Sequence, residues 1–200
     1  MIMAHGRGAS AEDILLLAED LHVPGFAFLA PQAAGHVWYP NPFSAPLESN
    51  EPWLSSALAG LGFLVDHAGK LGIPAERILL LGFSQGASLS LEFTARRARR
   101  YGGVAGLSGS LIGPDGAPRE YPGSLEGTPV FLGCSDVDPF VAKKRVVESS
   151  EVLMQLGARV TLRLYPGMDH SVSADEIHVV QEMMRLVAQS APEAQKGKGG

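Results

Sequence analysis

The stretch that decides the fold is Ile78-Leu-Leu-Leu-Gly-Phe-Ser84-Gln-Gly-Ala-Ser-Leu89. Its apolar first half is typical of a strand that is buried on both faces, and its second half favours a helix. Gly82 and Gly86 flank Ser84 in a G-x-S-x-G pattern, which is typical of a sharp turn from a strand into a helix. Because glycine has no side chain, neighbouring chain can approach this turn closely. The pattern therefore predicts that the Ser84 hydroxyl projects above a sheet as a nucleophile.

Apolar runs and helical patterns alternate along the rest of the chain. Strands are predicted at residues 2–4, 26–29, 78–81, 104–107, 130–132 and 160–165. Apolar residues at helical spacing lie between them, as at Leu54, Leu58, Leu61 and Val65, and Ser10 is expected to cap a first helix. This alternation predicts one α/β domain over residues 1–191, with a mainly parallel sheet of about six strands and helices on both faces. Residues 192–200 are predicted to form a disordered tail.

The composition narrows the classes of function. The chain has 200 residues, a net charge of −5 and a single cysteine, so it can form no disulfide within itself. The acidic balance disfavours a nucleic-acid binder, and the basic residues 96–100 are expected at the end of a helix, where they offset its dipole. The first residues show no basic region followed by a long apolar run, and no segment has the length of apolar sequence that a membrane helix needs. We therefore expect a cytoplasmic protein without stable membrane insertion.

A serine nucleophile needs a histidine base, which a carboxylate orients. With this turn type the carboxylate and then the histidine follow the serine along the chain. Of the two later histidines, His178 falls inside a predicted helix, whereas His170 lies in a turn-rich loop after a strand and is the predicted base. Asp136 and Asp138 both follow the strand before it, and spacing does not separate them. Asp169 is a poor candidate because adjacent residues on a short loop rarely face each other.

Two long irregular stretches, residues 31–52 and 108–129, follow predicted strands and are expected to shape an open site without a cap domain. Trp38, Tyr39, Phe140 and Met168 are predicted to build an apolar substrate pocket, although Trp38 and Tyr39 could equally pack the loop onto the sheet. Phe43 is more readily explained by packing alone. No metal or cofactor is expected, because Asp175, Glu176 and His178 have no second histidine at ligand spacing.

The chain resembles the phospholipase/carboxylesterase family of α/β-hydrolases, which includes the acyl-protein thioesterases. The matching segments occur in the family's order and are His5-Gly-Arg-Gly-Ala-Ser10, Gly82-Phe-Ser-Gln-Gly-Ala87, Leu107-Ser-Gly109, Ser135-Asp-Val-Asp-Pro-Phe-Val141 and Tyr165-Pro-Gly-Met-Asp-His170. The family's catalytic aspartate directly precedes a proline, so the resemblance favours Asp138. It also implies an oxyanion hole formed by the backbone N–H groups of Arg7 and Gln85.

The activity that the resemblance implies is hydrolysis of carboxylic esters through an acyl-enzyme intermediate. The acidic net charge and the lack of an amphipathic membrane helix favour short- to medium-chain esters over bilayer phospholipids. An acyl thioesterase or a lysophospholipase would use the same residues, and a binding protein that retains the fold is a remote second class.

The sequence departs from the family in two places. Asp169 stands where a glycine commonly precedes the catalytic histidine. The chain also begins four residues before the His5-Gly6 motif, whereas relatives carry one or two earlier strands, although a late start codon explains this equally well. If those strands are absent, the strand at residues 26–29 becomes an apolar edge, through which a homodimer is predicted to form.

Overall fold

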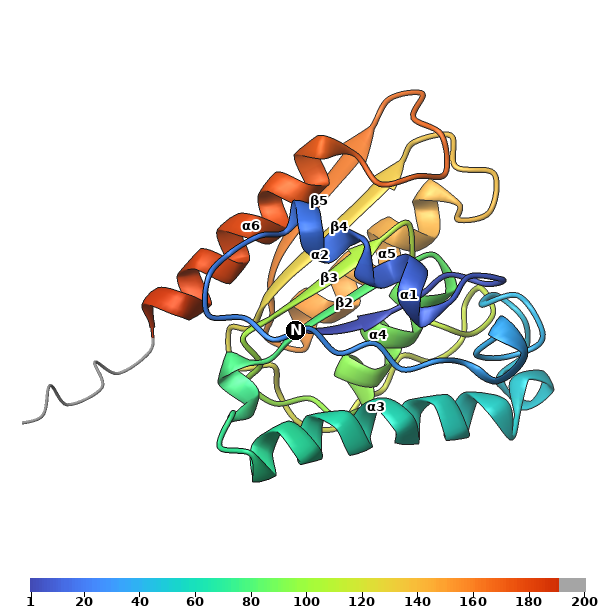
Figure 1. Ribbon diagram of the computed structural model, residues 1–200. Coiled ribbons are helices and arrows are strands. Elements are labelled where there is room, and N and C mark those ends of the chain that lie inside the picture. The colour runs from blue at the N-terminus through green and yellow to red at the C-terminus, as the bar shows by residue number, and fades with distance from the viewer. Residues whose placement is uncertain (191–200) are drawn as a thin grey trace, which may run out of the picture.

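The computed structural model describes residues 1–190, and a parallel sheet of five strands runs through its centre (Figure 1). The strands lie side by side in chain order: β1 (Ile2–Ala4), β2 (Leu79–Phe83), β3 (Gly103–Leu107), β4 (Pro129–Ser135) and β5 (Arg159–Tyr165). The predicted domain boundary at residue 191 and the predicted tail at residues 192–200 lie outside the described residues. All four pairings are parallel, so the carboxyl ends of the strands meet at one edge of the sheet.

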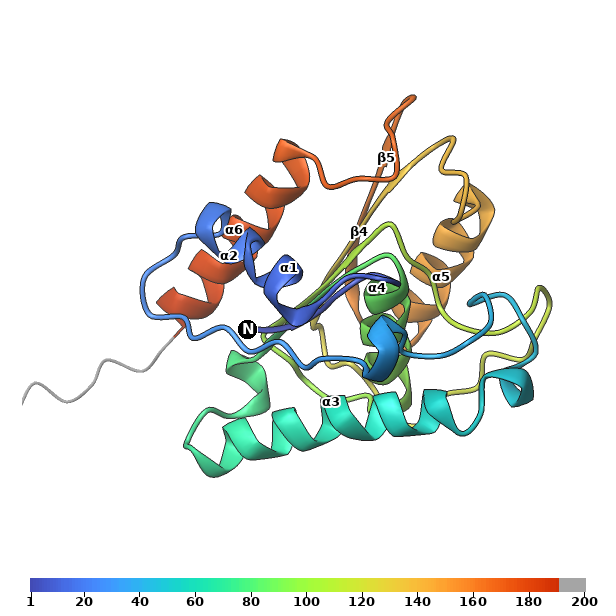
Figure 2. The ribbon, with the colours of Figure 1, turned by 45° about the vertical axis from the view of Figure 1, so that its right-hand side comes forward.

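Helices cover both faces of this sheet, as the alternation predicts. One face carries α3 (Trp53–Lys70), α4 (Gln85–Arg96) and α5 (Lys143–Gln155). The other carries α1 (Ala11–Leu15) and α6 (Ala174–Gln189), with the short α2 (Leu17–Asp20) beside them. Figure 2 shows the two layers with the sheet seen close to edge-on. The arrangement is that of an α/β-hydrolase, and no cap domain is present among residues 1–190.

The local signals explain where these helices begin and which face they bury. Ser10 forms a capping box with Asp13, in which each side chain binds the other residue's backbone N–H. In α3, Leu54, Leu61 and Val65 are buried at the predicted helical spacing. The helix α4 ends at Arg96, so the basic residues 96–100 lie at its carboxyl end, as predicted.

The predicted strand at residues 26–29 is absent, and this reduces the sheet from about six strands to five. Only Leu29 forms a bridge, to Ile2, in which the Met3 amide donates to the Leu29 carbonyl at 2.8 Å and the Leu29 amide donates to the Met1 carbonyl at 2.9 Å. Phe26 and Phe28 pack against the core on the α6 side. Their side chains are therefore partly buried, while the backbone pairing of this segment is limited to one bridge. The homodimer expected through this edge stays a prediction.

The two long stretches remain mostly irregular. Residues 31–52 contain two short 3₁₀ helices, Ala34–His36 and Leu47–Asn50, and a third, Ala75–Arg77, precedes β2. Residues 108–128 contain no helix or strand, and β4 begins at Pro129. None of the helices within residues 1–190 combines the length and the apolar character that crossing a bilayer requires.

Candidate active site

Ser84 occupies the turn between β2 and α4 in a strained backbone conformation. Its φ of 54° and ψ of −118° are rare for a residue with a side chain, and such strain concentrates at functional sites. The Ser84 amide donates a hydrogen bond of 2.9 Å to the Leu107 carbonyl, which fixes the turn to β3. A Cβ on Gly82 would overlap the Gly86 carbonyl, and one on Gly86 would overlap the Ala4 carbonyl. Both glycines are therefore required where the helix crosses close to β1 and β2.

Ser84, His170 and Asp138 form one hydrogen-bonded chain. His170 Nε2 lies 2.9 Å from Ser84 Oγ, and His170 Nδ1 lies 2.7 Å from Asp138 Oδ2. These residues come from the carboxyl ends of three strands, β2, β4 and β5, which the parallel sheet brings to one edge. The geometry is that of a serine whose hydroxyl proton can pass to an imidazole held by a carboxylate.

Asp138 is held in its ionised form. Burial alone would raise the pKa of this carboxyl, but the hydrogen bond from His170 and those from the Phe140 and Val141 amides outweigh it and lower the pKa. The two amides donate to Oδ1 at 2.8 and 2.9 Å. The Cys134 thiol lies 3.8 Å from Oδ2, and burial raises its pKa to about 12. It therefore stays protonated and faces the carboxylate as a weak donor.

The structure separates the two aspartates that spacing leaves equivalent. Asp136 forms no hydrogen bond with His170, and its Oδ1 accepts one of 2.9 Å from the Gly167 amide. It therefore fastens the turn that leads to His170. Asp169 and His178 take no part in the hydrogen-bonded chain, because Asp169 is exposed on its loop and His178 is exposed on α6.

Two aromatic rings flank the His170 imidazole. The Phe83 ring lies 5.0 Å from it between centroids, and the Phe140 ring lies 4.9 Å away with its edge toward it. His170 is thereby confined on both sides, which favours a single orientation of the ring. Phe140 is 70% exposed, so its outer face is available to a bound molecule.

Gly6, which precedes Arg7, and Gln85 both lie beside Ser84. Gly6 packs so closely that a Cβ there would meet Ser84 Cβ at 3.5 Å, and Gln85 is the first residue of α4. Neither the Arg7 nor the Gln85 amide donates a hydrogen bond to any acceptor within residues 1–190. Both donors are therefore free for a ligand, and the Gln85 amide also lies at the positive end of a helix.

A cavity of about 660 Å³ opens above this chain of residues, within the size range of small-molecule sites. Its lining combines proline and aromatic side chains with the polar groups of the site: Arg7, Tyr39, Pro40, Pro42, Phe43, Ser84, Gln85, Ser88, Pro139, Phe140, Val141 and His170. Tyr39 and Phe140 are thus among the predicted pocket residues that line it, and Trp38 and Met168 are not.

Trp38 instead holds the first loop in place. Its indole N–H donates to the His5 carbonyl at 2.8 Å, and its backbone amide donates to Gln85 Oε1 at 3.0 Å. Gln85 Nε2 in turn donates to the Tyr39 carbonyl at 2.7 Å. The side chain next to the nucleophile therefore fixes the loop that walls the cavity.

Sequence reasoning missed several lining residues. Ser88 could have been found, because it lies one helical turn after Ser84 and so shares its face of α4. The segment Tyr39-Pro-Asn-Pro-Phe43 gives no periodic signal, since its position depends on the side chains of Gln85 and Arg7.

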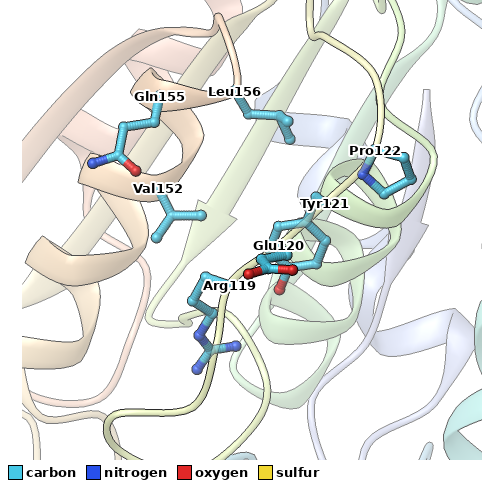
Figure 3. Close-up of a pocket in the computed structure, with 7 residues that line it drawn as sticks. All are labelled: Arg119, Glu120, Tyr121, Pro122, Val152, Gln155 and Leu156. Atoms are coloured by element: carbon cyan, nitrogen blue, oxygen red, sulfur yellow. The ribbon is translucent and has the colours of Figure 1, made fainter.

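The second long loop lies at a different cavity. Residues 108–129 contribute nothing to the lining of the first cavity, although both loops are expected to shape the site. Arg119, Glu120, Tyr121 and Pro122 instead face Val152, Gln155 and Leu156 at the end of α5 across a cavity of about 550 Å³ (Figure 3). No serine, histidine or cysteine is among these lining residues.

The acidic residues near the start of α6 are engaged in structural contacts. Asp175 pairs with Arg163 and Tyr165, and Glu176 caps the helix through Ser173. Within the described part of the chain, no three His, Cys, Asp or Glu side chains are grouped in a way that could hold a metal ion.

The fold and the serine, histidine and aspartate at its sheet edge define an α/β-hydrolase. The model of the phospholipase/carboxylesterase family matches residues 1–188, and the chain belongs to this family.

Relatives and solved structures agree with this assignment. Acyl-protein thioesterase 1 of Candida albicans is 32% identical over 131 residues, which cover 64% of this chain and 57% of that protein. The corresponding protein of Gibberella zeae is 35% identical over 57% of this chain and 49% of its own length. The matched part therefore spans about half of these relatives. The crystal structure of a phospholipase/carboxylesterase from Dyadobacter fermentans has a TM-score of 0.88 and 44% identity, and the match covers 92% of this chain and 88% of that one.

Proposed function

We propose that this chain is a serine carboxylesterase that hydrolyses short- to medium-chain carboxylic esters through an acyl-enzyme intermediate. The observation that carries the proposal is the chain of hydrogen bonds from Ser84 through His170 to Asp138, open to a cavity beside two free backbone amides. The apolar walls and the limited volume of that cavity support an acyl group of modest length.

In the acylation step, His170 Nε2 takes the proton of Ser84 Oγ as this oxygen attacks the carbonyl carbon of the ester. The carbonyl oxygen becomes negatively charged, and the amides of Arg7 and Gln85 donate hydrogen bonds to it. Asp138 holds the Nδ1–H side of the ring and stabilises the imidazolium. His170 then gives the proton to the leaving alcohol oxygen, the ester bond breaks, and the acyl group remains on Ser84.

In the deacylation step, the same groups act on water. His170 Nε2 takes a proton from a water molecule, whose oxygen attacks the acyl carbon, and the two amides again stabilise the oxyanion. The bond to Ser84 Oγ breaks, this oxygen recovers its proton from His170, and the carboxylic acid leaves. Because no step needs another group, the chain's own residues are sufficient for the reaction.

A second candidate is hydrolysis of acyl thioesters, favoured by the likeness to proteins named acyl-protein thioesterase 1. A lysophospholipase would use the same residues. The carboxylesterase, thioesterase and lysophospholipase reactions differ only in the leaving group, so Ser84, His170 and Asp138 have the same roles in each. A binding protein that retains the fold is opposed by the presence of every member of the hydrogen-bonded chain.

The test is the turnover of 4-nitrophenyl esters from acetate to octanoate beside the matching acyl-coenzyme A thioesters. We expect the wild-type chain to cleave the esters with higher kcat/KM, and Ser84→Ala to lower kcat by about 10⁵-fold or more. A higher kcat/KM on the thioesters than on the esters would favour the acyl thioesterase over the carboxylesterase. Equal turnover by the Ser84→Ala variant would contradict both.

A further inference from the structure

The cavity at Ser84 contains one fixed positive charge and no carboxylate. Arg7 is the only arginine or lysine in its lining, which otherwise consists of apolar side chains and of neutral polar ones together with the His170 imidazole. The chain as a whole has a net charge of −5. The positive charge of Arg7 is therefore opposite in sign to the net charge of the chain, and it favours a negatively charged ligand in this cavity.

The guanidinium of Arg7 is held in place but only partly used. Its Nη2 donates to the Tyr39 carbonyl at 2.8 Å and to the Asn41 carbonyl at 3.1 Å. Within residues 1–190, Nε and Nη1 donate to no acceptor, and no carboxylate lies within ion-pair distance. The two carbonyls fix the group without neutralising it, so its remaining donors are ready for a ligand.

The position of Arg7 relates this charge to the reaction. Its backbone amide is one of the two proposed donors to the oxyanion, so its side chain starts next to the carbonyl group that would be attacked. A group bound by the guanidinium would therefore lie a short distance from the reacting ester bond. A planar guanidinium matches a carboxylate well, and a single cation suits a monoanion better than a doubly charged phosphate.

We infer that Arg7 makes this enzyme prefer esters that carry a free carboxylate elsewhere in the molecule. The inference rests on the proposed esterase function and specifies its substrate class. The carboxylate can belong to the acyl part, as in a half-ester of a dicarboxylic acid, or to the alcohol part. The experiment distinguishes these two arrangements.

The test uses two matched pairs of substrates. The first pair is mono-4-nitrophenyl glutarate and its methyl ester, which differ in charge on the acyl side. The second is 4-acetoxybenzoate and its methyl ester, which differ on the alcohol side. The readout is the ratio of kcat/KM for the charged member to that for the neutral member, so a general loss of activity cancels.

We expect Arg7→Gln to lower this ratio about tenfold for at least one pair, which is the effect of losing one charge-assisted hydrogen bond. Arg7→Lys should keep most of the ratio because it keeps the charge. Added salt should lower the ratio of the wild-type chain and not that of Arg7→Gln. The matched control is Arg119→Gln, because Arg119 also donates to two backbone carbonyls but lines the other cavity.

Three outcomes contradict the inference. A ratio that changes less than about twofold in Arg7→Gln for both pairs, even if both rates fall together, would show that Arg7 only holds residues 39–41 in place. An equal fall in Arg119→Gln would show an effect that is not local. If the wild-type chain cleaves neither member of either pair, the proposed function fails first and the inference fails with it.

Discussion

Two cavities within residues 1–190 are similar in size, and each is lined by one of the two long loops, but only one of the two contains a serine and a histidine. The cavity of about 660 Å³ contains Ser84 and His170, and residues 39–43 close one side of it. The cavity of about 550 Å³ lies between residues 119–122 and the end of α5. Both loops are long and irregular, so neither loop length nor cavity volume identifies the site. What distinguishes the first loop is its attachment to the side chains of Gln85 and Arg7.

The largest expected effect separates the two aspartates after β4. Asp138→Ala should lower kcat on 4-nitrophenyl esters by about 10⁴-fold, because His170 loses the group that orients it and stabilises its positive form. Asp136→Ala should lower the free energy of unfolding by about 1–2 kcal/mol through loss of the Gly167 hydrogen bond and reduce kcat far less. Steady-state kinetics and urea unfolding measure the two effects. The reverse pattern would show that Asp136 is the acid.

A smaller effect on kcat/KM is expected when the first long loop loses the side-chain hydrogen bonds that hold it, and none is expected when the second long loop does. Gln85→Ala should lower kcat/KM about tenfold and the free energy of unfolding by about 2 kcal/mol, because the Trp38 amide and the Tyr39 carbonyl lose their partners. The matched variant on the second loop is Tyr121→Phe, which removes a hydrogen bond of 3.0 Å to Glu92. It should cost stability alone. Equal losses of kcat/KM in both variants would place the second loop at the site as well.

The preference for acyl-chain length should change when the cavity at Ser84 is enlarged, and it should not change when the second cavity is enlarged. Phe43→Ala removes part of the apolar wall, so the gain in kcat/KM from acetate to hexanoate should shrink by about fourfold for each methylene group that loses contact. Val152→Ala, which opens the second cavity, is the control and should leave the preference unchanged. A shift in preference in the Val152 variant would contradict the assignment of the acyl group to the first cavity.

The smallest effect concerns the acid dependence of stability. The folded state lowers the pKa of Asp138 below its ordinary value of 3.8. Its stabilising contribution is therefore fully present above the unfolded-state pKa and is lost as the pH falls through the folded-state pKa. The difference in unfolding free energy between wild type and Asp138→Asn should thus shrink between about pH 5 and pH 3. Urea unfolding over this range measures it, and a constant difference would be inconsistent with the lowered pKa.

Much of this arrangement can be predicted from the sequence where the physical constraint is local. The strand, the two glycines and the serine at residues 78–86 determine a turn that little else can satisfy, and the capping box at Ser10 is equally self-contained. The strand predicted at residues 26–29 is reduced to one bridge at Leu29, because an apolar run that mainly packs onto a core has the same sequence pattern as one that pairs along its whole length. Asp138 and Asp136 are distinguishable only through the tertiary contacts of His170 and Gly167.

The pocket is the least predictable part for the same reason. Trp38 and Phe43 are five residues apart on one irregular loop, and their sequence pattern does not show which of them lines the cavity. In the structure Trp38 supports the loop through hydrogen bonds to His5 and Gln85, which are far away along the chain, whereas Phe43 lines the cavity.

The most direct measurement of the proposed role of Ser84 is labelling with a fluorophosphonate, followed by mass spectrometry of the peptides. The reagent phosphonylates a serine only where a base activates it and donors stabilise the oxyanion. We expect one adduct per chain, on Ser84, and none in the Ser84→Ala variant. An adduct on another residue, or a wild-type chain that hydrolyses esters without being labelled at Ser84, would contradict its assignment as the nucleophile.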